Sequence, residues 1–147
     1  MIPGDYAGGR LRKATRDDLD RCFEIRESVR ENRLDDPYEV FIEIGGQFID
    51  DGWSWVWEQA GIVQGFAAYI PDTGTIEVLY IHHLAQGRGI GTALLRQCCD
   101  DLRALGQQEA ILSTTPGTRA ESFYRGCGWK EFGVNKVGDL LFKLPLG

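Results

Sequence analysis

Residues 86–91, with the sequence QGRGIG, have the residue types and spacing of an anion site. The three glycines stand at alternate positions, so the backbone there can turn tightly and approach a ligand closely. A helical apolar period begins at once, which brings free N–H groups and the positive end of a helix dipole to one point. A pyrophosphate fits such a site, and Arg88 can add a charge-assisted hydrogen bond.

Other interpretations of this segment remain open at this point. A glycine-rich turn before a helix can also exist without any ligand. Two common nucleotide motifs do not match: the segment lacks the Gly-Lys-Ser/Thr of a Walker loop, and a dinucleotide-binding βαβ unit has a different glycine spacing.

The elements before this segment must place it at the end of a sheet. Residues 11–14 predict a strand, and Thr15 begins a helix with Asp18 as its capping-box partner. A second helix is predicted near Asp36, with Asp36 as its N-cap and Pro37 in its first turn.

From Gly52 the apolar residues no longer recur at helical spacing but at every second position. Trp53, Trp55 and Trp57 alternate, which predicts a strand with one face packed beneath a helix. A hairpin turn at residues 60–61 and strands at 62–70 and 75–82 complete an antiparallel meander.

Helical spacing returns from Ile90 and ends at Gly106. A strand at 110–114, a helix at 118–127 and strands at 129–134 and 140–144 follow. The order β-α-α-β-β-β-α-β-α-β-β predicts an α/β (α+β) fold, with a mixed, mainly antiparallel central sheet of about seven strands and helices on both faces. We expect residues 1–147 to form a single domain.

Composition narrows the classes of function. A net charge of -6 disfavours nucleic-acid binding, which needs clustered Lys and Arg. The four cysteines include no C-x-x-C pair, and His82 and His83 are the histidines of the sequence, so we expect no metal site. We find neither a signal-peptide pattern nor an apolar run of about 20 residues, and expect a cytoplasmic protein without membrane contact.

A second motif follows the first at a characteristic distance. Residues 86–91 match the pattern Q/R-x-x-G-x-G/A, and residues 120–129 match A-x-x-F-Y-x-x-x-G-F/W. With the strand residues 79–82 before them and the same order of elements, nearly the whole chain resembles the GNAT superfamily of N-acetyltransferases.

This resemblance implies acetyl-CoA (coenzyme A) as the acyl donor, bound where the fourth and fifth strands splay apart. The pyrophosphate would lie on the amides of the glycine segment, and the Leu79 amide would hold the thioester carbonyl. The implied cofactor-binding residues are Leu79, Ile81, Gln86, Gly87, Arg88, Gly89, Ile90, Gly91, Thr92 and Tyr124.

Two side chains are candidates for proton transfer. Tyr124 stands at the family's tyrosine position and would protonate the departing thiolate; otherwise it is a core aromatic. Glu77 lies two residues before Leu79 on one strand face and would accept the amine proton through water; otherwise it is an ordinary strand carboxylate. The family's commonest glutamate corresponds to Thr75, and Gly117 stands where relatives often have Asn.

The resemblance places acceptor specificity in the first two helices and neighbouring strands. Acidic residues there would attract a cationic amine, on a small molecule or a peptide, unless they form a solvated helix face. The region contains Glu27, Arg30, Glu31, Asn32, Asp35, Asp36, Glu39 and Glu43. An acyl-CoA-binding module without turnover and a phosphate-ligand protein unrelated to CoA are the alternatives, and the resemblance allows a homodimer.

Overall fold

The computed structural model describes residues 8–29 and 36–147, which contribute seven strands to one sheet. The strands are β1 (Gly9–Lys13), β2 (Ser54–Gln59), β3 (Ile62–Ile70), β4 (Thr75–Ile81), β5 (Glu109–Thr114), β6 (Lys130–Val134) and β7 (Leu140–Pro145). The helices are α1 (Leu19–Ser28), α2 (Tyr38–Asp50), α3 (Ile90–Ala104) and α4 (Arg119–Gly126), with 3-10 turns η1 (Arg16–Asp18) and η2 (His83–Ala85). In this part of the chain, no helix is long and apolar enough to cross a bilayer.

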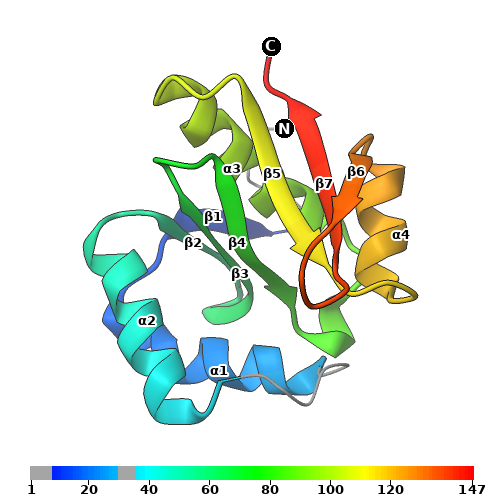
Figure 1. Ribbon diagram of the computed structural model, residues 1–147. Coiled ribbons are helices and arrows are strands. Elements are labelled where there is room, and N and C mark those ends of the chain that lie inside the picture. Colours follow the sequence, from blue (N-terminus) through cyan, green and yellow to red (C-terminus); the bar gives the residue numbers. More distant parts are fainter. Residues whose placement is uncertain (1–7, 30–35) are drawn as a thin grey trace.

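The strands lie in the order β1-β2-β3-β4-β5-β7-β6, and β4–β5 is a parallel pair among antiparallel ones. Helices α1 and α2 cover one face of the sheet, and α3 and α4 cover the other (Figure 1). The predicted mixed, mainly antiparallel fold and its order of elements are therefore confirmed.

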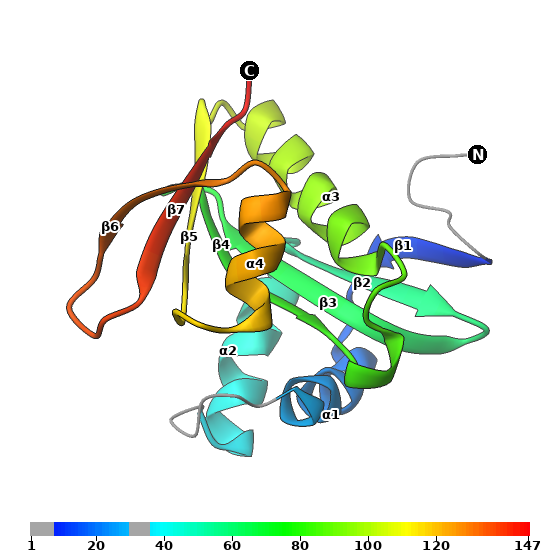
Figure 2. The ribbon, with the colours of Figure 1, turned by 90° about the vertical axis from the view of Figure 1, so that its right-hand side faces the viewer.

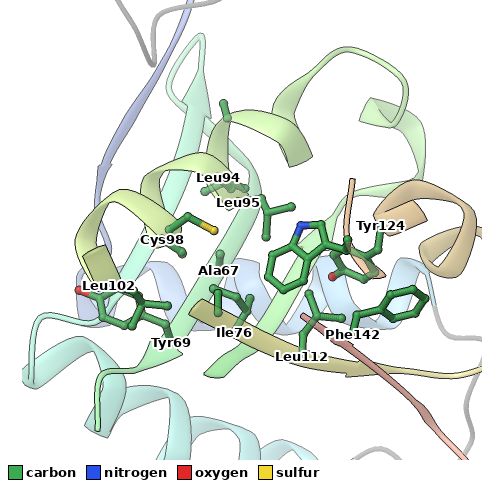
Figure 3. Close-up of a cluster of buried hydrophobic side chains, with 14 of the residues drawn as sticks. Ala67, Tyr69, Ile76, Leu94, Leu95, Cys98, Leu102, Leu112, Tyr124 and Phe142 are labelled. Carbon is green, nitrogen blue, oxygen red and sulfur yellow. The ribbon is translucent and has the colours of Figure 1, made fainter. Parts of the chain in front are cut away.

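The larger core lies between the sheet and helices α3 and α4 (Figure 3). Leu94 and Leu102 of α3 and Phe142 of β7 are completely buried there. Burial of such side chains contributes roughly 1.5–3 kcal/mol each. This core fixes α3, and with it the glycine segment that precedes the helix, against the sheet.

Asp101 of α3 connects this helix to the sheet, including the strand β2 that contains Trp55 and Trp57. Asp101 accepts hydrogen bonds from Trp55 Nε1 at 2.8 Å and from the Tyr69 hydroxyl at 2.9 Å. Trp57 is 1 % exposed in the same core. The predicted packing of this strand face beneath a helix is therefore confirmed for Trp55 and Trp57, while Trp53 immediately precedes β2 and lies against Phe48 of α2.

Several predicted boundaries were wrong by one or two residues. The N-cap of α2 is Pro37 rather than Asp36, because the extended backbone of proline (ψ 167°) precedes the first helical residue. Strand β4 ends at Ile81, since His82 caps the 3-10 turn by accepting the Leu84 N–H on Nδ1. Strand β1 also begins earlier than predicted, at Gly9.

The predicted capping box at Thr15 and Asp18 is present, and it also binds Arg12. Asp18 accepts from Arg12 Nη1 at 2.8 Å, from Arg12 Nη2 at 2.9 Å and from the Thr15 amide at 2.8 Å. Burial alone would raise the pKa of Asp18, but these hydrogen bonds together lower it below its ordinary value. The buried carboxylate therefore joins β1 to the start of α1.

We expect Asp18→Asn to lower the free energy of unfolding by about 2 kcal/mol at neutral pH, since hydrogen bonds to charged groups contribute about that much. The folded-state pKa of Asp18 is the lower one, so this stability is complete above the unfolded pKa of about 4 and is lost as the pH falls through the folded value. Urea titrations of both proteins at several pH values measure the difference.

Asp50 is the matched control, because it also accepts two hydrogen bonds from an arginine, Arg16. Both side chains of that pair are more than half exposed. Asp50→Asn is expected to change stability much less than Asp18→Asn, because water and salt screen an exposed ion pair. Equal losses for the two variants would show that the Asp18 pair has no special role.

Candidate functional site

Strands β4 and β5 open a cleft in the middle of the sheet. In the described part of the chain their register consists of the parallel pair Thr75 and Ile111. Beyond this pair the strands diverge, as Figure 2 shows. A cavity of about 790 Å³ lies here, lined by both strands, by the segment before α3 and by α4.

This cavity brings together almost all the site residues that the sequence predicted. Its lining includes Glu77, Leu79, Ile81, Gln86, Gly87, Gly89, Ile90, Gly91, Thr92 and Tyr124. Arg88 is exposed and is not part of that lining. Residues from four elements thus meet at one cleft, and Arg88 lies outside it.

The glycine segment adopts the conformation that its composition predicts. Gly87 and Gly89 have φ values of +81° and +84°, a region that favours glycine. Gly89 is the N-cap of α3, so the amides of the following residues form the free first turn of a 15-residue helix. Gln86 Nε2 donates to the Ile81 carbonyl at 3.4 Å and ties the segment to the end of β4.

Gly91 allows a close fit between α3 and α4. A Cβ atom at this position would lie 3.3 Å from Phe123 Cζ and 3.6 Å from Ile81 Cγ1. A larger residue would therefore push Phe123, and the helix that contains it, away from the glycine segment. The segment, the end of β4 and α4 form one cradle around the helix N-terminus, which fits an extended anionic ligand.

A second arginine lies beside this cradle and was missed by the sequence analysis. Arg119 Nη2 lies 3.9 Å from where a Cβ atom on Gly87 would stand, and Arg119 lines the cavity. It is the first residue of α4, where the helix dipole disfavours a cation. That local mismatch was the signal in the sequence that could have singled out Arg119.

Tyr124 of α4 lines the cleft and is buried. Figure 3 shows it among the core side chains near Leu112 and Phe142. Its ring is 6.4 Å from that of Phe142, and 7 % of the residue is exposed. Burial, followed by the proximity of Tyr80, raises the pKa of Tyr124 well above its ordinary value, so its hydroxyl stays protonated at neutral pH. The residue combines core packing with a place in the lining of the cleft.

Strand β4 contains an extra residue, which is Glu77. Ile76 pairs with Tyr69 and Val78 pairs with Ala68, so Glu77 has no opposite residue on β3. Because of this bulge, Ile76 packs on the α3 face and Val78 on the α1 face, and simple alternation does not hold across it. Alternation is regular from Val78 to Ile81, and Glu77 lies at the break before it, so the prediction that Glu77 and Leu79 share one face stays a prediction.

A second cavity of about 260 Å³ lies between helices α1 and α2 and the sheet. Glu77, Val78 and Tyr80 line this cavity and the larger one. The bulge at Glu77 thus lies where the two cavities meet. Sequence analysis gave Tyr80 no part in the site, although its position in the strand beside the motif was visible.

Gly117, where the resemblance leads one to expect Asn, precedes the N-cap of α4. Its φ is +79°, a conformation that Gly and Asn both tolerate, and its amide donates to Glu121 Oε1 at 2.8 Å. The Thr118 hydroxyl caps α4 by accepting the Glu121 amide at 3.3 Å. The backbone of this chain is therefore left-handed at the position where the resemblance leads one to expect Asn.

The predicted acidic residues near the acceptor have different positions. Asp36 lines the second cavity, and Glu27 lies beside Arg26 on α1. Glu39 and Glu43 are exposed on α2 and belong to neither lining. Four residues of this set lie outside the described residues: Arg30, Glu31, Asn32 and Asp35.

The cysteines take no part in an exposed reactive site. Cys22, Cys98 and Cys99 are buried. Burial raises the pKa of Cys99 to about 11 and that of Cys22 to about 12, so both thiols stay protonated at neutral pH. Cys127 is half-buried, and burial raises its pKa as well.

Comparison with solved structures shows the same fold in proteins of distant sequence. An N-acetyltransferase from Staphylococcus aureus Mu50 is 21 % identical (TM-score 0.78), and the match covers 96 % of this chain and 100 % of that chain. YncA from Salmonella typhimurium, solved with its cofactor acetyl-CoA, is 19 % identical (TM-score 0.78; 96 % and 95 % covered). The PaiA N-acetyltransferase from Thermoplasma acidophilum, solved with coenzyme A, is 18 % identical (TM-score 0.75; 93 % and 98 % covered).

Sequence comparison gives the family itself. The search of curated proteins found no match. The sequence model of the acetyltransferase (GNAT) family matches residues 12–129, from β1 to the end of the second motif. This match spans most of the chain and includes the glycine segment, the bulged strand and Tyr124. The protein therefore belongs to the acetyltransferase (GNAT) family.

Proposed function

We propose that this protein is an N-acetyltransferase that moves the acetyl group of acetyl-CoA to a primary amine by direct attack in a ternary complex. The observation that carries the proposal is the cleft between β4 and β5, which joins the glycine cradle at α3 to Tyr124. A long, thin donor with a charged end needs a site of this shape.

The glycine cradle is the part that we assign to the donor's pyrophosphate. The amides of residues 86–92 would donate to it, and Arg119 would add a charge-assisted contact. Leu79 and Ile81 line the cleft beyond the paired residues Thr75 and Ile111, and we assign their backbone groups, apart from the Ile81 carbonyl that accepts from Gln86, to the pantetheine arm. When bound, acetyl-CoA supplies an activated thioester.

Tyr124 is the group that we assign as general acid. A departing thiolate needs a proton, and the raised pKa of Tyr124 keeps that proton on its hydroxyl at neutral pH. The residue lines the donor cleft with its ring held by Trp129 and Phe142. Such packing holds the hydroxyl in one position, which a general acid needs in order to protonate a single sulfur atom.

Glu77 is the group that we assign to the amine, acting as general base through water. The bulge exposes its carboxylate where the two cavities meet, between the proposed donor and acceptor sites. A carboxylate there attracts a protonated amine and accepts its proton before attack. Together with Asp36 in the second cavity, it favours a cationic amine as the acceptor.

The first test is ligand binding measured as a thermal shift. At 100 times its Kd, acetyl-CoA should add about 2.7 kcal/mol to the stability of the native state, which corresponds to a Tm increase of about 5–10 °C. ATP and NAD at equal concentration should give less, because they lack the pantetheine arm that the β4–β5 cleft accepts. Equal shifts from all three would favour a general phosphate-binding protein.

The second step is a panel of amines assayed by thiol release from acetyl-CoA. The proposal expects amine-dependent release with at least one class of acceptor. Tight binding of acetyl-CoA without release for any amine would instead indicate a non-catalytic acyl-CoA-binding module.

A further inference from the structure

The second cavity contains a buried arginine. The Arg26 side chain is 7 % exposed and lines this cavity but not the donor cleft. Its guanidinium carbon lies 4.8 Å from the ring centroid of Phe41 and 5.1 Å from that of Phe23. Two aromatic rings therefore hold a permanently charged group in the wall of this cavity.

The hydrogen bonds of Arg26 are incomplete. Nη2 donates to the Asp36 carbonyl and approaches Glu27 Oε2 at 3.5 Å, a long contact. Nε is buried and has no hydrogen-bond partner among residues 8–29 and 36–147. Buried donors in native proteins are almost always paired, so the Arg26 guanidinium has hydrogen-bonding capacity that the described residues do not fill.

The position of Arg26 relative to the donor cleft restricts which part of a bound substrate can accept a hydrogen bond from it. The attacking amine must reach the junction of the cavities, where Glu77 and Tyr80 stand. Arg26 belongs to the second cavity alone, so it meets another part of the same molecule. The cavity thus presents a carboxylate toward the amine and a guanidinium toward the rest of the acceptor, between walls that include Phe48 and Phe66.

We propose that the acceptor is a compact zwitterion, an amine that also bears a carboxylate, as in an α-amino acid with an apolar side chain. The carboxylate accepts a hydrogen bond from the Arg26 guanidinium, and the amine faces Glu77. This inference rests on the proposed transferase function and names the substrate class for the same site. A simple polyamine fits less well, because Arg26 repels a second ammonium group.

Three acceptors of similar shape test the proposal: L-leucine, L-leucinamide and isopentylamine, which is leucine without its carboxylate. We expect kcat/KM for leucine to exceed that for isopentylamine by about tenfold or more, with leucinamide between them, since a charged hydrogen bond is lost with the carboxylate. Arg26→Gln should bring the ratio of leucine to isopentylamine close to one, and Arg26→Lys should retain part of it.

Arg21→Gln is the matched control on the same helix. Arg21 donates from Nε to the Val63 carbonyl at 2.8 Å and lines neither cavity, so its loss should leave the acceptor ratio unchanged. Isopentylamine turnover by Arg26→Gln shows that the variant is folded. If that variant does not fold, the ratios in the wild type and in Arg26→Lys decide.

The outcomes separate this inference from the proposed function. Turnover of isopentylamine without preference for leucine, or a preference that survives in Arg26→Gln, would overturn the inference and leave the transferase function in place. An acetyl-CoA thermal shift with no turnover of any of the three acceptors would also overturn it. Loss of both the shift and all thiol release would instead refute the proposed function.

Discussion

Tyr124→Phe is expected to lower kcat by a factor on the order of 100 or more while leaving the Kd for acetyl-CoA within about threefold. General acids typically contribute 10²–10⁴-fold to a rate, and phenylalanine keeps the packing against Phe142 and Trp129 but has no proton to donate. Steady-state thiol release gives kcat, and calorimetry with acetyl-CoA gives the Kd.

Tyr69→Phe separates this effect from the loss of a buried hydroxyl in general. Tyr69 is 2 % exposed, and its hydroxyl donates to Asp101 at 2.9 Å on the part of the core away from the cleft. That variant should lose about 1 kcal/mol of stability and keep its kcat. If Tyr124→Phe behaved in the same way, Tyr124 would be a packing residue and another group would protonate the thiolate.

The pH dependence of kcat follows from the same assignment. Because burial raises the pKa of Tyr124, its ionisation should not appear as an alkaline loss of activity below about pH 10, the ordinary value for tyrosine. An alkaline limb near neutrality would have to come from a different acid.

Local patterns predicted most of the fold, because here they agree with the tertiary structure. The strand at 62–70 was predicted with both ends correct, since its apolar residues are bounded by turns on both sides. The hairpin at residues 60–61 has positive φ at Ala60 and Gly61, as a tight two-residue connection requires. Errors occurred at caps, such as Asp36 and Pro37, where two neighbouring residues both satisfy the local rules.

The site was predictable where it is local in sequence and not where it depends on pairing between distant segments. Residues 86–92 form one segment that the motif points to, and all of them except Arg88 line the cleft. The bulge at Glu77 is a property of how β4 pairs with β3, which the sequence of β4 alone does not show. Arg26 and Arg119 line their cavities because of how α1 and α4 pack on the sheet. The periodicity of apolar residues in the sequence does not predict where those helices lie.

Gly89→Val is expected to raise the Kd for acetyl-CoA by about 100-fold. Gly89 has φ +84°, a conformation that a β-branched residue rarely adopts, so the backbone before Ile90 must change. The first-turn amides of α3 would then no longer converge on the pyrophosphate. Loss of two charge-assisted hydrogen bonds, at about 1.5 kcal/mol each or more, corresponds to that change in Kd. Gly89→Asn should retain more affinity, since asparagine tolerates this conformation.

The opposite end of α3 provides the control for this prediction. Gly106 has φ +98°, and a Cβ atom at Gly106 or at Gly89 would meet no described atom within 4 Å. Valine therefore introduces backbone strain, of about 1–3 kcal/mol, at either site without a clash. If Gly89→Val and Gly106→Val lose comparable stability and only Gly89→Val binds acetyl-CoA more weakly, the pyrophosphate lies at the N-terminus of α3. If Gly89→Val bound acetyl-CoA normally, the amides of that turn could not be the groups that hold the donor.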